Sequence, residues 1–283
     1  MTIKDKTFNC YRKYILMYAE VKYPITRKRK YSLKYYLDNF LHMQKDLSRW
    51  EALSLVNKNE KDYHWKTIYN EFNKWSKDGI FETAYIMFIE ENYFKMSKVR
   101  KNKKINLFID VTKIHNKYGC EKIGVNFENK KKNVTSIAVI CDDNKIPVGI
   151  EYMNTNLSKT KSGRHSIQHD VKGIQPTLDK IPFKVKNYVK VNLVGDKGYI
   201  TKKEFTVFGR KLNIITPKRS NQKTKNTKKE KKILKERHKI ENVFASLKSY
   251  DRVMLRKDRK IKNYMSFFYM ASMDHLCKRF KLA

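Results

Sequence analysis

The hydrophobic pattern changes at Ile105, and this change constrains the fold more than any other feature of the sequence. Before Ile105 the apolar residues recur every three or four positions, which is typical of amphipathic helices. After it they form short runs bounded by turn residues, as in INLFID (105–110), which is typical of buried strands. The sequence therefore predicts an all-helical region over residues 1–100 and a mixed α/β domain over residues 101–283.

The first hundred residues predict several helices. Apolar residues at helical spacing follow a basic run (27–30) and extend from Leu33 to Trp50. A second helix holds Trp65 and Trp75 and should stop at Gly79, and a third spans 80–94, before a basic linker at 98–104. Short helices with basic faces suggest a helix-turn-helix type of DNA-binding unit, and the alternative is a helical cap without a DNA role.

The second region predicts a sheet with helices on its faces. Strands are expected over 105–110, 134–141, 145–152, 188–196 and 212–216, with the turn of a hairpin at residues 142–144. Helices are expected near 171–180 and between Gly198 and Gly209. A polar basic loop (217–232) and two C-terminal helices complete the order.

The charge balance indicates a polyanionic partner. The chain has 64 Lys and Arg against 28 Asp and Glu, a formal net charge of +36. Nucleic acid is the favoured partner, because each neutralised phosphate releases a condensed counterion. An anionic membrane is the rival, but neither a basic amphipathic helix nor a lipidation signal is evident. Part of the Lys content is also consistent with an AT-rich genome. The loop from Lys218 to Lys232 carries eight basic residues, as either a solvated connection or a phosphate-binding segment.

Several features favour a soluble, intracellular, DNA-associated protein without a membrane segment. The charge-free apolar stretch Tyr264–Met273 is too short to span a bilayer, and the first twenty residues do not resemble a signal peptide. Four cysteines without CxxC spacing fit free thiols in a reducing compartment. The sequence does not distinguish a nucleoid from a host nucleus.

Two acids follow two of the expected strands, and a third lies on an expected helix. Asp110 follows INLFI and Asp196 follows VNLVG. Acids at neighbouring strand ends converge and repel one another unless a cation neutralises them, and oxygen ligands suit Mg²⁺ or Mn²⁺. On a helix, Arg237, Glu241 and Lys248 fall within a sector of about 40°. The alternative for Glu241 is an ordinary surface ion pair with Arg237.

Three blocks in order resemble the DDE transposases of the insertion-sequence-5 group: FIDVTK (108–113), GDKGY (195–199), and RHKIENVFASLK (237–248) followed by DRVMLRKDR (251–259). Upstream, YNEFNKWSKDGIFE (69–82) looks like the Trp-containing helix end that precedes their catalytic domain. In related groups a Tyr precedes the Arg of the third block, and Leu234 occupies that position here.

The resemblance implies a ribonuclease H-like fold and two Mg²⁺ or Mn²⁺ ions held by Asp110, Asp196 and Glu241. It implies metal-dependent cleavage and strand transfer of double-stranded DNA, at element ends and target, by a homodimer on DNA. The candidate DNA-binding residues are Arg237, Lys248, Lys197, Lys218 and Arg219. Two alternatives are a metal nuclease of the same fold that hydrolyses without joining, and a non-catalytic DNA-binding relic of a transposase.

Other residues carry weaker signals. His165 and His169 are four apart and, with Asp170, would form a metal-binding face if they lay on one helix; structural or surface histidines are the alternative. Tyr199 follows the second acid, and the sequence leaves open whether it packs or contacts DNA.

Overall fold

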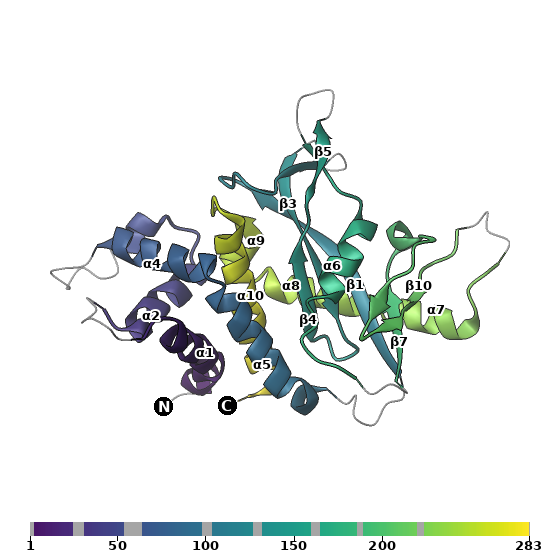
Figure 1. Ribbon diagram of the computed structural model, residues 1–283, viewed down its shortest axis with the longest axis horizontal. Helices are drawn as coiled ribbons and strands as arrows, with labels where there is room; N and C mark the ends of the chain where they lie inside the picture. Colours follow the sequence, from purple (N-terminus) through teal and green to yellow (C-terminus); the bar gives the residue numbers. More distant parts are fainter. Residues whose placement is uncertain are drawn as a thin grey trace. The chain divides into compact units, whose positions relative to one another are not determined.

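The computed structural model describes residues 3–24, 31–53, 64–97, 104–126, 132–159, 165–185, 189–219 and 224–282 (Figure 1). The chain divides into two compact units. The first comprises Met1–Phe88, Lys117–Glu121 and Leu247–Ala283, and the second comprises Ile89–Asn116 and Lys122–Ser246.

The first unit is helical. It contains α1 (Ile3–Lys22), α2 (Leu33–Gln44), η1 (Trp50–Ala52), α4 (Trp65–Lys77), most of α5 (Ile80–Met96), α9 (Asp251–Met254), the short strand β11 (Leu255–Arg256) and α10 (Ile261–Phe280). The all-helical character expected for the N-terminal region is therefore confirmed for its described residues. Among the described helices, none combines the length and the apolar composition that a bilayer crossing requires.

An aromatic core stabilises this unit. The rings of Phe40 and Phe72 are 5.1 Å apart, and those of Phe72 and Phe267 are 4.8 Å apart. Phe267 belongs to α10, which contacts α1, α2, α4 and α9. The C-terminal residues thus group with the N-terminal helices, although the sequence-based division placed them in the catalytic domain. The division into a DNA-binding region (1–100) and a catalytic domain (101–283) stays a prediction.

The helix boundaries differ in one place from those expected. The segment from Leu33 was expected to continue as a helix to Trp50, but α2 ends at Gln44. The carboxylate of Asp46 accepts hydrogen bonds from the backbone N–H and the hydroxyl of Ser48, and this local turn competes with the helix. The stop at Gly79 is confirmed, because this residue has φ +75°, which favours glycine. The basic run 27–30 and residues 98–103 of the expected linker lie outside the described residues.

The second unit contains a mixed sheet. Its strands are β1 (Lys104–Asn116), β2 (Gly124–Asn126), β3 (Lys132–Cys141), β4 (Pro147–Tyr152), β5 (Thr155–Lys159), β6 (His165–Ile167), β7 (Lys190–Val194) and β10 (Asn213–Ile215), and β8 (Thr206–Val207) pairs separately with β9 (Arg210–Lys211). β10, β7, β1 and β3 are neighbours in this order (Figure 1). β7 is parallel to both β1 and β10, whereas β3 is antiparallel to β1 and to β4. The expected mixed α/β character is confirmed, as is the hairpin with its turn at 142–144.

The helices of this unit are short. They are η3 (Asp170–Gly173), α6 (Ile174–Leu178), η4 (Lys197–Tyr199), α7 (Lys228–Lys235) and α8 (His238–Leu247). α6 packs against β3 and β4. In α8, Ile240, Val243 and Phe244 are buried, so one face of this helix belongs to the core.

Two expectations about the strands and turns near the acids are wrong. β1 does not end at Asp110 but continues to Asn116, because β3 pairs with it as far as His115. No helix spans Gly198 to Gly209 in this described stretch. A single turn (η4) is followed by the β8–β9 hairpin, in which Gly209 has φ +74°. Short polar segments carry too little periodicity to separate a helix from a hairpin.

One further expectation fails, and one of the two alternatives for a pair of histidines is excluded. The basic loop was expected to reach residue 232, but α7 begins at Lys228, because Thr227 and Glu230 form a capping box that satisfies the first N–H groups. His165 and His169 do not share a helix: His165 lies in β6, and the ring of His169 caps η3 by accepting from the Val171 N–H.

Candidate active site

Strand register brings Asp110 and Asp196 together. The parallel pairing of β1 with β7 ends at the pair Phe108 and Val194. Asp110 and Asp196 each follow two residues later, and neighbouring strands are about 4.8 Å apart. β1 continues, whereas the chain after Val194 turns into η4, where the Asp196 carboxylate accepts a 2.7 Å hydrogen bond from the Gly198 N–H. The two acids therefore meet at the point where β7 ends.

Asp110 lies among other negatively charged side chains. Its side chain is 24% exposed, and one carboxylate oxygen accepts a 2.8 Å hydrogen bond from the Val111 N–H. Burial raises the pKa of Asp110, and the charges of Asp196 and Asp170 raise it further. The Val111 N–H and the Arg237 guanidinium act in the opposite direction, but the net direction is upward. A cation placed among these acids would relieve the repulsion.

Arg237 connects Asp110 to Glu241. One guanidinium nitrogen lies 3.6 Å from Asp110 Oδ2, and another donates a 2.9 Å hydrogen bond to Glu241 Oε1. The surface ion pair considered for Glu241 is thus present, but the same Arg also reaches a strand carboxylate. Glu241 is half-exposed, and one guanidinium group separates its carboxylate from that of Asp110.

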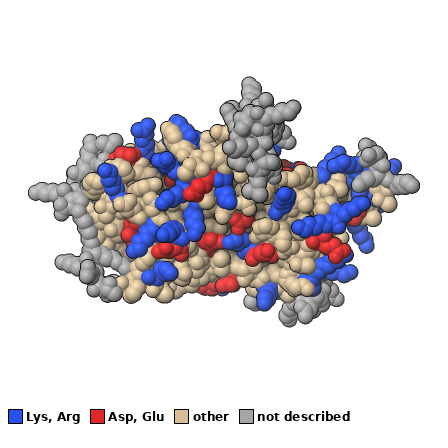
Figure 2. Space-filling model, turned by 45° about the horizontal axis from the view of Figure 1, so that its top comes forward, with Lys and Arg blue, Asp and Glu red and all other residues tan. Residues whose placement is uncertain are grey.

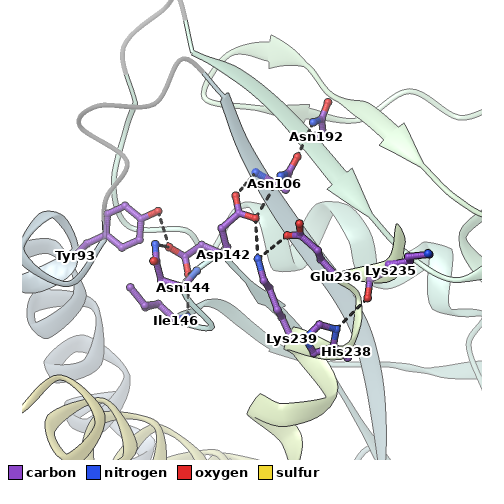
Figure 3. A network of polar contacts seen from close by, with 11 residues as sticks. Tyr93, Asn106, Asp142, Asn144, Ile146, Asn192, Lys235, Glu236, His238 and Lys239 are labelled. Carbon is purple, nitrogen blue, oxygen red and sulfur yellow. Dashed lines mark hydrogen bonds and ion pairs between the residues drawn. The ribbon is translucent and has the colours of Figure 1, made fainter. Parts of the chain in front are cut away.

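Lys239 fixes the first turn of α8 next to the sheet (Figure 3). Its ammonium lies 3.3 Å from Asp143 Oδ1 and 2.7 Å from Glu236 Oε2, and it stands 5.3 Å from the centre of the Phe108 ring. Asp143 belongs to the turn between β3 and β4, and Phe108 belongs to β1. The helix that carries Glu241 is therefore held by the hairpin and by the strand that carries Asp110.

The same turn is tied to β1 and β7. The backbone N–H of Asn106 donates to Asp143 Oδ2 at 3.0 Å, and Asn192 of β7 donates to the Asn106 side chain at 2.8 Å (Figure 3). Asp142 is fully buried, and its carboxylate accepts from the Asn144 and Ile146 N–H groups, both at 2.9 Å. The Tyr93 hydroxyl also donates to it, at 3.2 Å. Burial raises the pKa of Asp142 to about 6.

Tyr199 ends η4, the turn that Asp196 caps. Its side chain is fully buried, and its ring packs on Gly195, where an added Cβ would lie 2.7 Å from the ring. Its hydroxyl has no hydrogen-bond partner among the residues that the structure describes. Burial raises the pKa of Tyr199, and the charges of Asp170, Asp110 and Asp196 raise it further. Packing thus accounts for the ring, and the hydroxyl lies close to the acidic cluster.

The candidate DNA-binding residues have different locations. Arg237 lies among the acids, and Lys197, Lys218 and Arg219 are exposed residues of the same unit. Lys248 belongs to the first unit, directly after α8. Their predicted contacts with DNA stay predictions.

The basic residues are broadly distributed. Figure 2 shows Lys and Arg side chains across the visible face, with fewer Asp and Glu among them. On the second unit, α7 exposes Lys228, Lys229, Lys231, Lys232 and Lys235. This distribution suits a partner that is negatively charged along its length.

Asp170 lies near the site, and the pattern of acids that follow strands does not identify it, because it lies in a turn. It begins η3, which contacts η4, and its charge acts on both Asp110 and Tyr199. The sequence offers only a weak signal, an acid directly before an expected helix. Its proximity to Asp196 results from the packing of two distant turns.

The donor set fits a small divalent cation. Carboxylate oxygens are the ligands that Mg²⁺ and Mn²⁺ prefer, and the buried Tyr199 hydroxyl has no hydrogen-bond partner among the described residues. As the side chains stand, no three His, Cys, Asp or Glu residues in the described part of the chain are arranged to hold a metal ion. Arg237 pairs with both Asp110 and Glu241, so its guanidinium lies between these two acids.

One family model matches part of the chain. Residues 174–261 match the family model of the transposase DDE domain. The match includes Asp196, Arg237 and Glu241 and begins after Asp110 and Asp170. No curated protein matches the chain. The chain is also similar to a solved structure of the piggyBac transposase synaptic complex with hairpin DNA, over 98% of this chain and 74% of that chain, with 10% identity and a TM-score of 0.47.

Proposed function

We propose that this protein is a transposase that cleaves and joins DNA at a site formed by Asp110, Asp196 and Glu241. One observation carries the proposal: strand register brings Asp110 beside Asp196, and Arg237 links Asp110 to Glu241. Two of these three acids lie in the segment that resembles the transposase DDE domain.

The sheet topology supports this proposal. A ribonuclease H-like fold of the expected kind has one acid on its first strand, one at its fourth, and a glutamate on a later helix. Here Asp110 lies on β1, Asp196 lies two residues after the end of β7, and Glu241 lies on α8. The strands run β10-β7-β1-β3 with β4 beyond β3, and β7 is parallel to β1.

We assign the three acids to the binding of two Mg²⁺ or Mn²⁺ ions. When bound, such ions activate a water or a DNA 3′-hydroxyl and stabilise the leaving oxygen in phosphoryl transfer. Burial raises the pKa of Asp110, the negative charges of Asp196 and Asp170 raise it further, and this repulsion gives the site its attraction for cations. The planar guanidinium of Arg237 suits a phosphate, so we expect it to leave the acids and bind DNA near the scissile bond.

We assign the exposed basic residues Lys197, Lys218 and Arg219 to the DNA backbone, and Lys248 to phosphate binding from the first unit. Pairing two element ends requires two active sites, so we propose a homodimer on DNA. Because phosphate contacts release counterions, binding should weaken steeply as salt rises.

Mutation of Asp110 tests this function. The substrate is a supercoiled plasmid that carries the DNA flanking the coding sequence, incubated with Mg²⁺ or Mn²⁺. Asp110→Asn should bind this DNA within about twofold of wild type but nick it at least about a thousandfold more slowly, a loss of roughly 4 kcal/mol of transition-state stabilisation. Asp179→Asn, an exposed residue of the same unit, should nick normally. Nicking by Asp110→Asn at the wild-type rate would remove Asp110 from the site.

Two other functions are compatible with the same residues. A nuclease of this fold would nick DNA but yield no strand-transfer product from a pre-cleaved end. A non-catalytic relic would bind DNA with a strong dependence on salt and would cleave neither substrate. Plasmid nicking together with strand transfer from the pre-cleaved end therefore separates all three: a transposase does both, a nuclease only nicks, and a relic does neither.

A further inference from the structure

Asp170 faces Asp196 across Gly198. A Cβ added at Gly198 would lie 2.9 Å from Asp196 Oδ1 and 3.8 Å from Asp170 Oδ2. The backbone of Gly198 is not in the left-handed region, so conformational freedom does not explain a glycine here. Glycine has only a hydrogen atom where other residues have Cβ. The position that a Cβ would occupy at Gly198 lies between one carboxylate oxygen of Asp196 and one of Asp170.

Three carboxylates therefore approach this part of the unit from separate segments. Asp110 comes from β1, Asp170 from η3 and Asp196 from the start of η4. Asp170 and Asp196 each act on Asp110 and on Tyr199 through their charge. Arg237 offsets part of the charge on the Asp110 side, where it also pairs with Glu241. Because these carboxylates are partly buried and repel one another, they favour the binding of a cation.

The Tyr199 hydroxyl is an independent indication of a ligand. It is fully buried and has no hydrogen-bond partner in the described part of the chain, and the charges of all three acids act on it. A buried O–H without an acceptor is unfavourable, so such groups in native proteins usually bond to an oxygen of water or a ligand. A water carried by a bound cation would supply that oxygen.

We propose that Asp170 is a fourth carboxylate of the cation site, contributing to the divalent cation bound at Asp196, with the Tyr199 hydroxyl bonded to a water of that cation. This inference rests on the proposed function, because it concerns the same site. It explains the glycine at position 198, since a methyl group there would fill the space between the two carboxylates.

Mn²⁺ binding to the full chain tests this inference. The protein is stripped with EDTA, dialysed, and titrated with Mn²⁺ in a calorimeter. Asp170→Asn should weaken Mn²⁺ binding by about tenfold or more, as loss of a carboxylate from a metal site does. Asp179→Asn is the matched control: it removes the same charge from an exposed position in the same unit and should bind within about twofold of wild type.

The outcomes distinguish this inference from the proposed function. If Asp170→Asn binds Mn²⁺ like wild type while Asp110→Asn does not, the inference is overturned and the proposed site stands. If wild type binds no Mn²⁺, both are overturned. Thermal unfolding in EDTA reports whether each variant is folded. If Asp170→Asn does not fold, Gly198→Ala takes its place, with the same expected loss, and wild-type affinity in that variant overturns the inference.

Discussion

The buried carboxylate of Asp142 makes the stability of the protein depend on pH. This residue shapes the turn between β3 and β4, and the neighbouring Asp143 holds Lys239 of α8 and Asn106 of β1. Burial raises the pKa of Asp142 from its ordinary 3.8 to about 6. Because the folded state binds this proton more tightly than the unfolded state, the contribution is fully present below pH 3.8 and is lost as pH rises through about 6.

The magnitude follows from the two pKa values. Their difference corresponds to about 3 kcal/mol, of which about 2 to 3 kcal/mol is lost between pH 4 and pH 7. Asp142→Asn keeps the shape and accepts hydrogen bonds at every pH, but it does not ionise. The free energy of unfolding of wild type should therefore fall, relative to that of Asp142→Asn, by about 2 to 3 kcal/mol as pH rises from 4 to 7.

Urea unfolding at 25 °C, followed by far-UV circular dichroism at pH 4, 5, 6 and 7, measures this difference. The exposed Asp179→Asn variant controls for the loss of one carboxylate, and its difference from wild type should vary by no more than about 0.5 kcal/mol. A difference between wild type and Asp142→Asn that stays constant across this range would refute the link between burial and pH dependence.

Three further substitutions probe the packing around the site and the helical unit. Tyr199→Phe removes only a buried hydroxyl without a described partner, so it should stabilise the EDTA-treated protein by about 1 kcal/mol; a loss of stability would mean that the hydroxyl has an acceptor. Gly195→Ala places a Cβ 2.7 Å from the Tyr199 ring and should cost about 1 to 3 kcal/mol in urea unfolding, and an unchanged midpoint would contradict this contact. Arg252→Met leaves the buried Asp258 without its ion-pair partner and should cost about 3 to 5 kcal/mol, whereas the exposed Arg279→Met should cost less than about 1 kcal/mol. Equal melting temperatures for these two Arg variants would contradict a stabilising role for the buried Arg252 side chain, which also donates to the carbonyls of Met43, Asp46 and Ser48.

The sequence predicted the elements whose residues carry a strong local pattern. The helices α4 and α5, the stop at Gly79 and the β3–β4 hairpin follow from apolar periodicity and turn residues. Prediction from the sequence failed where a single local interaction or a very short element decided the structure. The capping box at Thr227 started α7 inside the expected loop, and the β8–β9 hairpin replaced an expected helix.

The candidate site was only partly visible in the sequence. Asp110, Asp196 and Glu241 were identified as acids after apolar runs or on a helical face, and Arg237 as their neighbour. The extent of β1 beyond Asp110 was missed, because it depends on pairing with β3 rather than on the residues of β1. Asp170 was missed as a neighbour of Asp196, because the two lie on separate turns that meet only through packing of η3 against η4.

The sequence by itself determined the elements with a strong local pattern, such as α4, α5 and the β3–β4 hairpin. It also determined that the chain is strongly basic and which acids follow apolar segments. Only the tertiary structure decided which of these acids lie together. The reason is physical, because periodicity reflects interactions between residues close in the chain. Strand register and helix packing depend on contacts between distant segments, and a shift by one residue would turn Asp110 to the other face of the sheet.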